Sequence, residues 1–507
     1  MQNRVLSNAI WNVVNGSSSA IVAVVVPPFL TRMLTPEAYG AWAVALQIGT
    51  YVTLFGFGLQ MAVGRYVAYA EARSDIAQRD GIVNSAFWFL LTASAVAWLA
   101  ICGLGFSIHR LLPNLSTALA EQTKVAVILV GLALAINLPG SIFAAVFTGQ
   151  HRSDIPAKIQ GSGRVLLALG LIAAAMSRNL AILGLVYAVI SIGTVAALWY
   201  AWKTRTLEPI LSPRLVKREH GRELVSFCFS LTIWNFAMLL VSGLDLLIVG
   251  RWDYAATPYF AVSVTLTTLV AGTITSLANA LVPAAASLPD DESGANLRQL
   301  LSRGSRFVMA ASIIAGVPMI FGGFTLLEVW LGHSYALKAA PILAILVIAT
   351  MLRNLLLPYV TLAIGTGNQR KLTVIPLAEG SVSIIASILL VGSSGAYGVA
   401  LAKIVGGLTG IILLIANHPL RTALGNWSRK DFMYKCVIKP AFAIVPILIL
   451  AYFLNYISFI DGWISLIVIT NFSIICVYLI TLDNHDRKAI IALFKNKIYS
   501  RSNGNFK

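Results

Sequence analysis

Apolar residues are gathered into fourteen long runs separated by short polar loops, and each run is about long enough to cross the hydrocarbon core of a bilayer as a helix. This pattern predicts an all-α polytopic membrane protein with about 14 transmembrane helices. The fifth run is the shortest and is bounded by Arg164 and Arg178. The predicted spans are Asn8–Leu30, Ala38–Gly64, Gly81–Ile108, Thr123–Phe147, Gly163–Met176, Ile182–Trp202, Leu224–Val249, Pro258–Ala286, Phe307–Trp330, Ala339–Ile364, Leu372–Val391, Ala396–Ala416, Cys436–Tyr456 and Gly462–Leu482.

Basic residues collect in every second loop. Of the 37 lysines and arginines, 29 fall on one side of the predicted membrane, while Arg353 and Lys403 lie within spans. Lys and Arg are enriched in cytoplasmic loops, so this asymmetry predicts that both termini are cytoplasmic. The expected location is the bacterial inner (cytoplasmic) membrane, which the chain crosses many times.

The composition excludes a soluble globular protein. Hydrophobic residues make up 58% of the 507 residues and charged residues 11%, and the mean hydropathy is +0.81. The net charge of +17 would suit a nucleic-acid-binding protein. Here, however, the positive charges flank predicted spans rather than one face of a soluble domain, so no nucleic-acid partner is expected.

The loops are too short to hold a soluble catalytic domain. The chain has no G-x-x-x-x-G-K-[ST] sequence and no H-E-x-x-H or C-x-x-C spacing, which argues against an ATPase of that type and against those metal sites. We therefore expect no enzymatic activity, catalytic residue, metal or cofactor. A glycan polymerase or glycosyltransferase is the alternative from the enzyme class, but the longest external loop, Ser107–Gln122, shows no catalytic spacing.

The two halves of the chain resemble each other. Three short matches occur in the same order, at offsets of 218 to 223 residues. The implied repeat has six spans, and an even number starts both copies on the same side of the membrane. Parallel repeats of this kind place a site at their interface. The matched positions are Ile10–Asn12 with Ile233–Asn235, Tyr39 with Tyr259, and Thr148–Arg152 with Thr366–Arg370.

This repeat predicts two six-helix lobes followed by two additional C-terminal helices. The expected segments are an N-terminal lobe (1–205), a cytoplasmic linker (206–223), a C-terminal lobe (224–418), two further transmembrane helices (419–482) and a basic cytoplasmic tail (483–507).

The segment after the first span, Arg32–Val44 (RMLTPEAYGAWAV), resembles the R-x-L-x-P-x-x-Y-G signature of bacterial polysaccharide flippases. These are the Wzx-like exporters of O-antigen and capsule repeat units, within the multidrug/oligosaccharidyl-lipid/polysaccharide exporter superfamily. The Thr-Gly-x-x-Arg sequence after span four, Asp245 in span seven and the fourteen-span count also look like that family. The resemblance covers the architecture of nearly the whole chain, but its sequence motifs cover only a few dozen residues.

The same segment has a local physical interpretation. Pro36 can open a helix, because the missing N–H is not needed in the first turn. Thr35 is suited to cap that helix, and Glu37 to complement its dipole. The segment is therefore expected to form a sharp turn between spans one and two. Whether the motif residues are structural or take part in gating stays open; those residues are Arg32, Pro36, Tyr39 and Gly40.

Four charged residues interrupt the apolar runs of the second half, and charges inside a membrane usually face a cavity and serve a function. Arg353 and Lys403 are candidates for binding an anionic substrate. Asp245 and Glu379 are candidates for ion coupling. Arg353 and Glu379 lie at comparable depths, ~20 Å and ~10 Å into their spans from opposite sides, and can pair. Structural alternatives are that ion pair, snorkelling of Lys403 to the interface, and a contact of Asp245 with Arg251.

The resemblance implies a flippase that translocates undecaprenyl-pyrophosphate-linked oligosaccharide repeat units to the periplasmic leaflet for surface polysaccharide biosynthesis. It implies alternating access with ion coupling, by protons or sodium. The expected partners are that lipid-linked oligosaccharide, membrane lipids, and a polysaccharide polymerase with its chain-length regulator. Two alternatives remain: a multidrug extruder, whose cationic substrates favour an acidic cavity, and a peptidoglycan-precursor flippase with the same fourteen-span plan.

Overall fold

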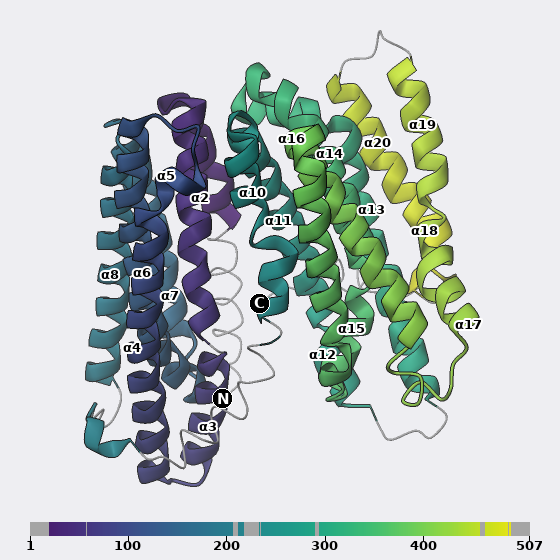
Figure 1. Cartoon of the computed structure of the whole chain (residues 1–507). Helices are drawn as coiled ribbons and strands as arrows, with labels where there is room; N and C mark the ends of the chain where they lie inside the picture. Colours follow the sequence, from purple (N-terminus) through teal and green to yellow (C-terminus); the bar gives the residue numbers. More distant parts are fainter. Residues whose placement is uncertain are drawn as a thin grey trace, which may run out of the picture. The chain divides into compact units, whose positions relative to one another are not determined.

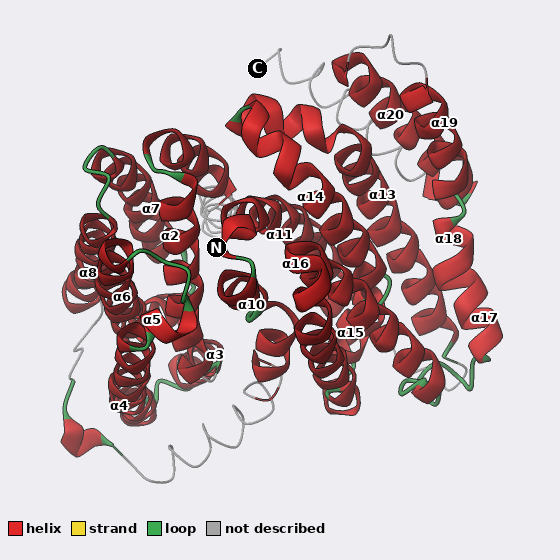
Figure 2. Ribbon diagram, turned by 45° about the horizontal axis from the view of Figure 1, so that its top comes forward, coloured by secondary structure: helices red, strands yellow, loops and turns green. Residues whose placement is uncertain are grey.

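The computed structural model describes residues 20–56, 58–205, 211–216, 233, 235–288, 294–456, 462–484 and 486–487. Within these ranges the regular structure is helical and no strand occurs (Figure 2). Eleven helices of the described residues are long and apolar enough to cross a membrane. The expectation of an all-α polytopic membrane protein is therefore confirmed.

The chain divides into two compact units (Figure 1). Unit 1 comprises Met1–Thr265 and Ser387–Val399, and unit 2 comprises Leu266–Ala386 and Ala400–Lys507. The lobe, linker and tail boundaries expected from the repeat stay a prediction. Helices that begin in unit 1 are Ala20–Met33, α2 (Pro36–Thr50), α3 (Leu59–Ala72), α4 (Ile76–Phe106), α5 (Ile108–Leu111), α6 (Thr117–Gly149), α7 (Asp154–Ala175), α8 (Leu180–Arg205), α10 (Asp245–Trp252) and α11 (Thr257–Asn279).

The remaining helices belong to unit 2, except that Ser387–Val399 of α16 belongs to unit 1. They are α12 (Leu281–Ala286), α13 (Ala295–Leu331), α14 (His333–Asn354), α15 (Leu357–Gly365), α16 (Val374–Asn417), α17 (Arg429–Met433), α18 (Lys439–Ala441), α19 (Ile444–Tyr456) and α20 (Gly462–Cys476). Short 3-10 or π turns occur at Tyr51–Gly56, Pro213–Leu215, Tyr254–Ala256, Gln369–Leu372, Tyr434–Ile438 and Val477–Thr481.

Two predicted spans are joined without a loop in α16, which is 44 residues long. The helix is interrupted at Gly395, where φ is 53° and ψ is −137°, a conformation that favours glycine. The chain reverses there, so that the two halves of α16 lie side by side (Figure 1). A Cβ at Gly406 in the second half would lie 2.9 Å from the Cβ of Ser383 in the first half. The predicted spans Leu372–Val391 and Ala396–Ala416 are these two halves.

The second span is interrupted rather than continuous. After α2 the chain forms the 3-10 turn Tyr51–Gly56, and α3 starts after Gly58, whose φ is 69°. Two threonine hydroxyls bond to backbone carbonyls around the turn: Thr50 Oγ1 donates to the Gln47 carbonyl and Thr53 Oγ1 to the Thr50 carbonyl. Such local bonds help the backbone to leave the α-helical path inside the membrane.

Helix α7 corrects the boundary expected for the fifth span. It begins at Asp154, nine residues before the predicted start at Gly163. Asp154 lies in its first turn and pairs with Lys158 at 3.5 Å, an i,i+4 contact that supports the helix start. The polar residues of these first turns hid the helix in the apolar pattern. Arg164 is consequently the eleventh residue of a 22-residue helix. A charged residue therefore also lies inside a helix of the first half.

Helix α6 is the centre of unit 1, where it packs against α3, α4 and α8. Its Phe143 ring lies 5.1 Å from the Trp202 ring and 5.8 Å from the Phe87 ring, between centroids. Small residues bring the helices close: a Cβ at Gly184 of α8 would lie 2.8 Å from the Ala126 Cα of α6. Close backbone approach through small residues is a usual way of packing membrane helices.

The last two spans are attached to α13 in unit 2. A Cβ at Gly322 of α13 would lie 2.4 Å from Leu466 Cδ1 of α20, so the glycine admits the leucine side chain. The Asp486 carboxylate, which is fully buried, receives Arg303 Nε at 3.0 Å and Arg306 Nη2 at 2.7 Å, both from α13. The C-terminal pair is therefore fastened to α13 by packing and by a charge-assisted network.

A buried polar cluster closes the end of α16 in unit 2. His418, which is 1% exposed, donates from Nε2 to the Trp427 carbonyl at 3.1 Å. Its Nδ1 can therefore accept the Tyr359 hydroxyl at 3.2 Å, and that hydroxyl accepts Leu420 N–H at 2.7 Å. With a neutral imidazole, both ring nitrogens of His418 and the Tyr359 hydroxyl have hydrogen-bond partners. Burial, aided by nearby arginines, lowers the pKa of His418.

We predict that Gly184→Val destabilises the protein by about 1–3 kcal/mol, because the larger side chain overpacks the α6–α8 contact. Gly193→Val in the same helix is the matched control, since a Cβ there would meet no atom within 4 Å. Retention of monodisperse protein after heating, measured by size exclusion, compares the two. Equal heat resistance of both variants would contradict this packing.

We also predict acid sensitivity from His418. An unfolded histidine takes up a proton near pH 6.5 while the buried one stays neutral, so the free energy of unfolding falls below that pH, by at most about 1.4 kcal/mol per pH unit. His418→Gln keeps one donor and one acceptor without a titrating proton. In this variant, the free energy of unfolding measured between pH 5 and 8 is expected to lose this component of its pH dependence. An unchanged acid slope would refute the assignment.

Candidate functional site

A charged cluster lies between α14 and α16 in unit 2. Arg353 Nε is 3.2 Å from Glu379 Oε1, and the side chains are 38% and 6% exposed. Lys403, on the second half of α16, also interacts electrostatically with Glu379. The structure thus brings together three of the four charged candidates. With all three ionised, the cluster carries one excess positive charge.

An interruption of the tenth span positions Arg353. Helix α14 ends at Asn354, and the chain closes with N–H groups of Leu355 and Leu356 donating to carbonyls three residues earlier. Pro358, in the first turn of α15, has no N–H to continue the α-helical ladder. Arg353 therefore occupies the last turn of a helix, where the dipole favours a cation.

Glycines on α16 position Glu379 from the other side. A Cβ at Gly406 would lie 2.9 Å from the Glu379 carbonyl oxygen, and one at Gly410 would lie 3.4 Å from Glu379 Oε2. The second half of the helix consequently passes directly beside the carboxylate. A larger residue at Gly406 would push the halves apart and move Lys403 relative to Glu379.

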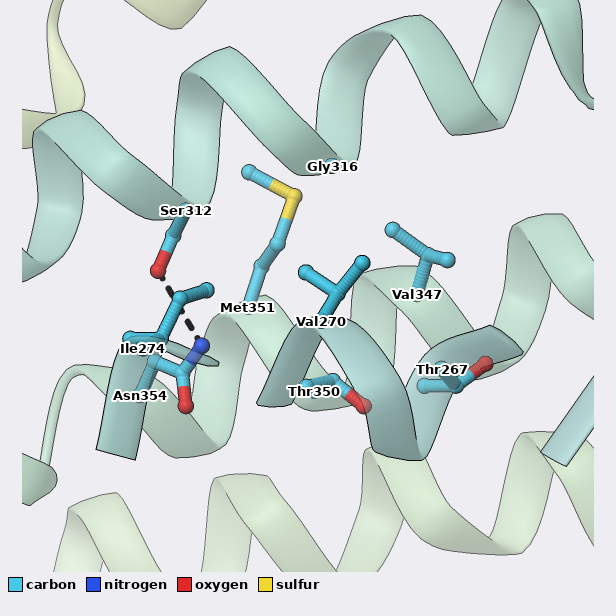
Figure 3. A pocket seen from close by; sticks show the side chains of 9 residues that line it. All are labelled: Thr267, Val270, Ile274, Ser312, Gly316, Val347, Thr350, Met351 and Asn354. Atoms are coloured by element: carbon cyan, nitrogen blue, oxygen red, sulfur yellow. Dashed lines mark hydrogen bonds between the residues drawn. The ribbon is translucent and has the colours of Figure 1, made fainter. Parts of the chain in front are cut away.

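A small pocket of unit 2 opens between α11, α13 and α14 (Figure 3). It holds about 220 Å³ of empty space, including its opening. Asn354 Nδ2 donates to Ser312 Oγ at 3.0 Å across the pocket wall. The pocket adds neutral hydrogen-bonding groups next to Arg353. Its lining residues are Thr267, Val270, Ile274, Ser312, Gly316, Val347, Thr350, Met351 and Asn354.

The charges along the spans do not reveal this pocket, because its lining residues are all uncharged. The signal that would have found it is a set of Ser, Thr and Asn residues at helical spacing, as in Thr350 and Asn354. Such residues are common in membrane helices and often bond to their own backbone, as Thr350 Oγ1 does to the Leu346 carbonyl. The helical spacing of Ser, Thr and Asn therefore does not distinguish residues that line a pocket from residues that bond only to their own backbone.

Asp245 lies in unit 1, at the first position of α10, and is 6% exposed. The seventh span is interrupted just before it, and the Gly243 carbonyl there accepts Gln47 Nε2 at 2.9 Å and Tyr51 Oη at 2.7 Å. Asp245 also interacts electrostatically with Tyr51. A carboxylate at a helix N-terminus is favoured by the dipole. Arg251 Nη1 donates to the Arg110 carbonyl at 2.5 Å, and the contact of Asp245 with Arg251 stays a prediction.

The turn motif has the local structure expected from its sequence. Thr35 Oγ1 accepts Ala38 N–H at 3.2 Å, and Pro36 lies in the first turn of α2. Tyr39 and Gly40 are buried, whereas Arg32 is exposed. A Cβ at Gly40 would lie 3.1 Å from Pro258 Cδ at the start of α11. The helix-start interpretation is confirmed, and the gating role stays a prediction.

The Thr-Gly motifs both end a helix with a residue of positive φ, but their register differs. His151 has φ 57° and Gly367 has φ 72°. The next residue closes the turn in each case, as Arg152 N–H donates to the Phe147 carbonyl and Asn368 N–H to the Ala363 carbonyl. The equivalent positions are therefore 216 residues apart, two fewer than the Thr-Gly match. The Ile10–Asn12 match lies outside the described residues, as does Trp234.

Comparisons with known proteins agree on family and fold. A family model described as "Polysaccharide biosynthesis protein" matches residues 29–340. A curated Bacillus subtilis (strain 168) protein described as "Uncharacterized membrane protein EpsK" is 22% identical over 462 residues, covering 89% of each chain. The lipid II flippase MurJ, in an inward closed conformation, has a TM-score of 0.68 at 13% identity and covers 97% of this chain and 99% of its own.

A multidrug resistance MATE family transporter of the MOP superfamily, in an inward-facing conformation, has a TM-score of 0.65 at 12% identity. The match covers 80% of this chain and 98% of that one. At such identities these two structures show a shared fold and do not identify a substrate.

Proposed function

Because the chain belongs to the polysaccharide biosynthesis protein family, we propose that it is a flippase for undecaprenyl-pyrophosphate-linked oligosaccharide repeat units. It moves them from the cytoplasmic to the periplasmic leaflet for surface polysaccharide biosynthesis, by alternating access. The family expected from the Arg32–Val44 motif is thus confirmed, and the fold is that of membrane transporters. The substrate and the direction of transport are the proposed parts of this function.

The observation that carries the proposal is the cluster of Arg353, Glu379 and Lys403. A lipid-linked oligosaccharide carries a pyrophosphate between its lipid and its sugars. A guanidinium can bind phosphate oxygens in a bidentate way, and an ammonium adds a point charge. Glu379 compensates one cation when no substrate is bound. When the substrate binds, its pyrophosphate replaces the Glu379 carboxylate as the partner of Arg353. The Arg353 side chain is 38% exposed.

The acidic candidates serve ion coupling in this proposal. When the pyrophosphate displaces Glu379 from Arg353, the freed Glu379 carboxylate takes up a cation or a proton. Asp245 takes up a cation or a proton at the interruption of the seventh span. The excess of positive charge in the cluster favours an anionic lipid over the cationic substrates of a multidrug extruder.

The chain acts as a transporter rather than an enzyme, in the bacterial inner membrane with both termini in the cytoplasm. A polysaccharide polymerase and a chain-length regulator use its product.

We predict that Arg353→Gln lowers the rate of flipping at least about tenfold, because a charge-assisted contact with phosphate contributes about 1.5–3 kcal/mol. Lys403→Gln is expected to lower it less, and Arg353→Lys to keep part of the rate. The assay follows a fluorescent undecaprenyl-pyrophosphate oligosaccharide in vesicles through its accessibility to an external quencher. Lys371→Gln, an exposed cation outside the spans, is the control.

A double variant separates substrate binding from a structural ion pair. The double variant Arg353→Gln with Glu379→Gln is compared with Glu379→Gln alone, which already lacks the coupling carboxylate. If Arg353 serves only to neutralise Glu379, adding Arg353→Gln causes no further loss of flipping. If Arg353 binds the pyrophosphate, the double variant flips more slowly than Glu379→Gln although it folds. Wild-type protein that leaves the glycolipid in its original leaflet but exports cationic drugs would overturn the proposed function.

A further inference from the structure

Helix α20 has one face packed inside unit 2 and one face exposed. Gly322 of α13 admits the Leu466 side chain on the packed face, whose buried residues are Leu466, Ile469, Ser473 and Cys476. Helices α19 and α20 lie at one edge of unit 2 (Figure 1). We call the exposed side of α20 its outer face, which consists of Ile464, Ile467, Val468, Asn471 and Ile475.

Asn471 is the polar member of this outer face and lies at its centre. It comes two residues before the buried Ser473, which is about half a helical turn, so it lies on the side opposite α13. It is the tenth residue of the 20-residue apolar span Gly462–Thr481. At 1.5 Å per residue it is therefore about 14 Å from either end of the span. Asn has no long stem, such as that of Lys or Arg, to carry its polar group to the membrane surface.

The Asn471 carboxamide is only partly satisfied by its own helix. Its Nδ2 donates to the Ile467 carbonyl at 2.9 Å. Among the described residues this is the only hydrogen bond that its side chain makes. A carboxamide has two donor hydrogens and an acceptor oxygen, so one N–H and Oδ1 remain. The hydrocarbon core of a bilayer offers no partner to either group.

Two neighbouring polar residues of α20 show the difference between a hydroxyl and an amide. Thr470 Oγ1 donates to the Leu466 carbonyl at 2.7 Å, and Ser473 Oγ donates to the Ile469 carbonyl at 2.7 Å. A hydroxyl has one donor hydrogen, so a bond to the preceding turn leaves no donor unpaired. The same kind of bond leaves Asn471 with a donor still unpaired. Asn471 therefore needs a partner from outside its own helix.

A second copy of α20 has the groups that Asn471 lacks. A carboxamide is self-complementary, because the N–H of one amide can donate to the oxygen of the other. Two copies inserted in the same orientation pair these helices in parallel, and a two-fold axis then places each Asn471 opposite its copy. The neighbouring apolar residues repeat at intervals of four, three and four, as in the seam of a helix pair: Ile464, Val468, Asn471 and Ile475.

We propose that the outer face of α20 is the interface of a homodimer in the membrane, joined by hydrogen bonds between the two Asn471 carboxamides. Lipid chains cover the apolar residues of this face equally well, but they leave the amide without a partner. The outer face contains none of the residues of the charged cluster or the pocket. The dimer is therefore proposed independently of the transport function.

The first experiment detects the contact in cell membranes. Val468→Cys is introduced into a protein whose four native cysteines are replaced by alanine, and a membrane-permeant oxidant is added. We expect a disulfide-linked pair of identical chains. Leu166→Cys on α7, whose native side chain is also exposed, is the control and is expected to remain a single chain. No pair at Val468, or equal pairing at both sites, overturns the interface. A Val468→Cys adduct with a different protein overturns the homodimer.

The second experiment tests the role of the amide. The dissociation constant of the dimer is measured in vesicles at a series of protein-to-lipid ratios, by counting bleaching steps of labelled chains. Asn471→Leu is expected to raise it about 5- to 30-fold, the range given by one hydrogen bond between membrane helices. Asn471→Gln is expected to keep part of the affinity.

Thr470→Val is the matched control for this measurement, because its hydroxyl is already bonded within the helix; its dissociation constant is expected to equal that of the wild type. Wild-type protein that stays monomeric at every protein-to-lipid ratio overturns the dimer. A dimer equally stable with Asn471→Leu overturns the pairing of the amides. Neither experiment contains a glycolipid, so both results are independent of whether the protein is a flippase.

Discussion

A backbone inside a bilayer has to satisfy its own N–H and C=O groups, because the hydrocarbon core supplies no water to bond them. This constraint makes uninterrupted helices the default and makes each interruption conspicuous. At one interruption the Gly243 carbonyl is bonded by Gln47 and Tyr51. At another the chain after Asn354 closes with short-range bonds before Pro358. The candidate charges lie beside these two places: Asp245 two residues after the first, and Arg353 in the helical turn that ends at the second.

Charge compensation is the second requirement that the bilayer imposes. Arg353 and Lys403 would be costly in an apolar span, and Glu379 lowers that cost by interacting with both. Two cations around one carboxylate leave one excess positive charge when all three groups are ionised. The glycines of α16 make it possible, because only their lack of a side chain lets the return half of the helix pass beside Glu379.

The same small residues join distant parts of the molecule. Gly184 brings α8 onto α6, Gly322 admits α20 onto α13, and Gly40 brings α2 onto the start of α11. Membrane helices gain little from burying apolar surface against each other, so close packing and occasional polar contacts hold them. This is one physical reason why a fold can persist at 12–13% identity to solved transporters.

The sequence by itself determined the features that depend on local composition. Apolar runs long enough for a bilayer indicate helices wherever they occur, and the Thr35-Pro36 pair starts a helix through bonds to its nearest neighbours. Depth estimates along two spans also anticipated the Arg353–Glu379 pair. Only the tertiary structure decided which side chains bond the Gly243 carbonyl, which hydroxyls share a pocket with Asn354, and which helix ends meet at Tyr254. These features depend on partners up to about 220 residues away, such as Glu37 for Tyr254. Hydropathy averaged along the chain records how apolar each segment is, but not which segment lies against it.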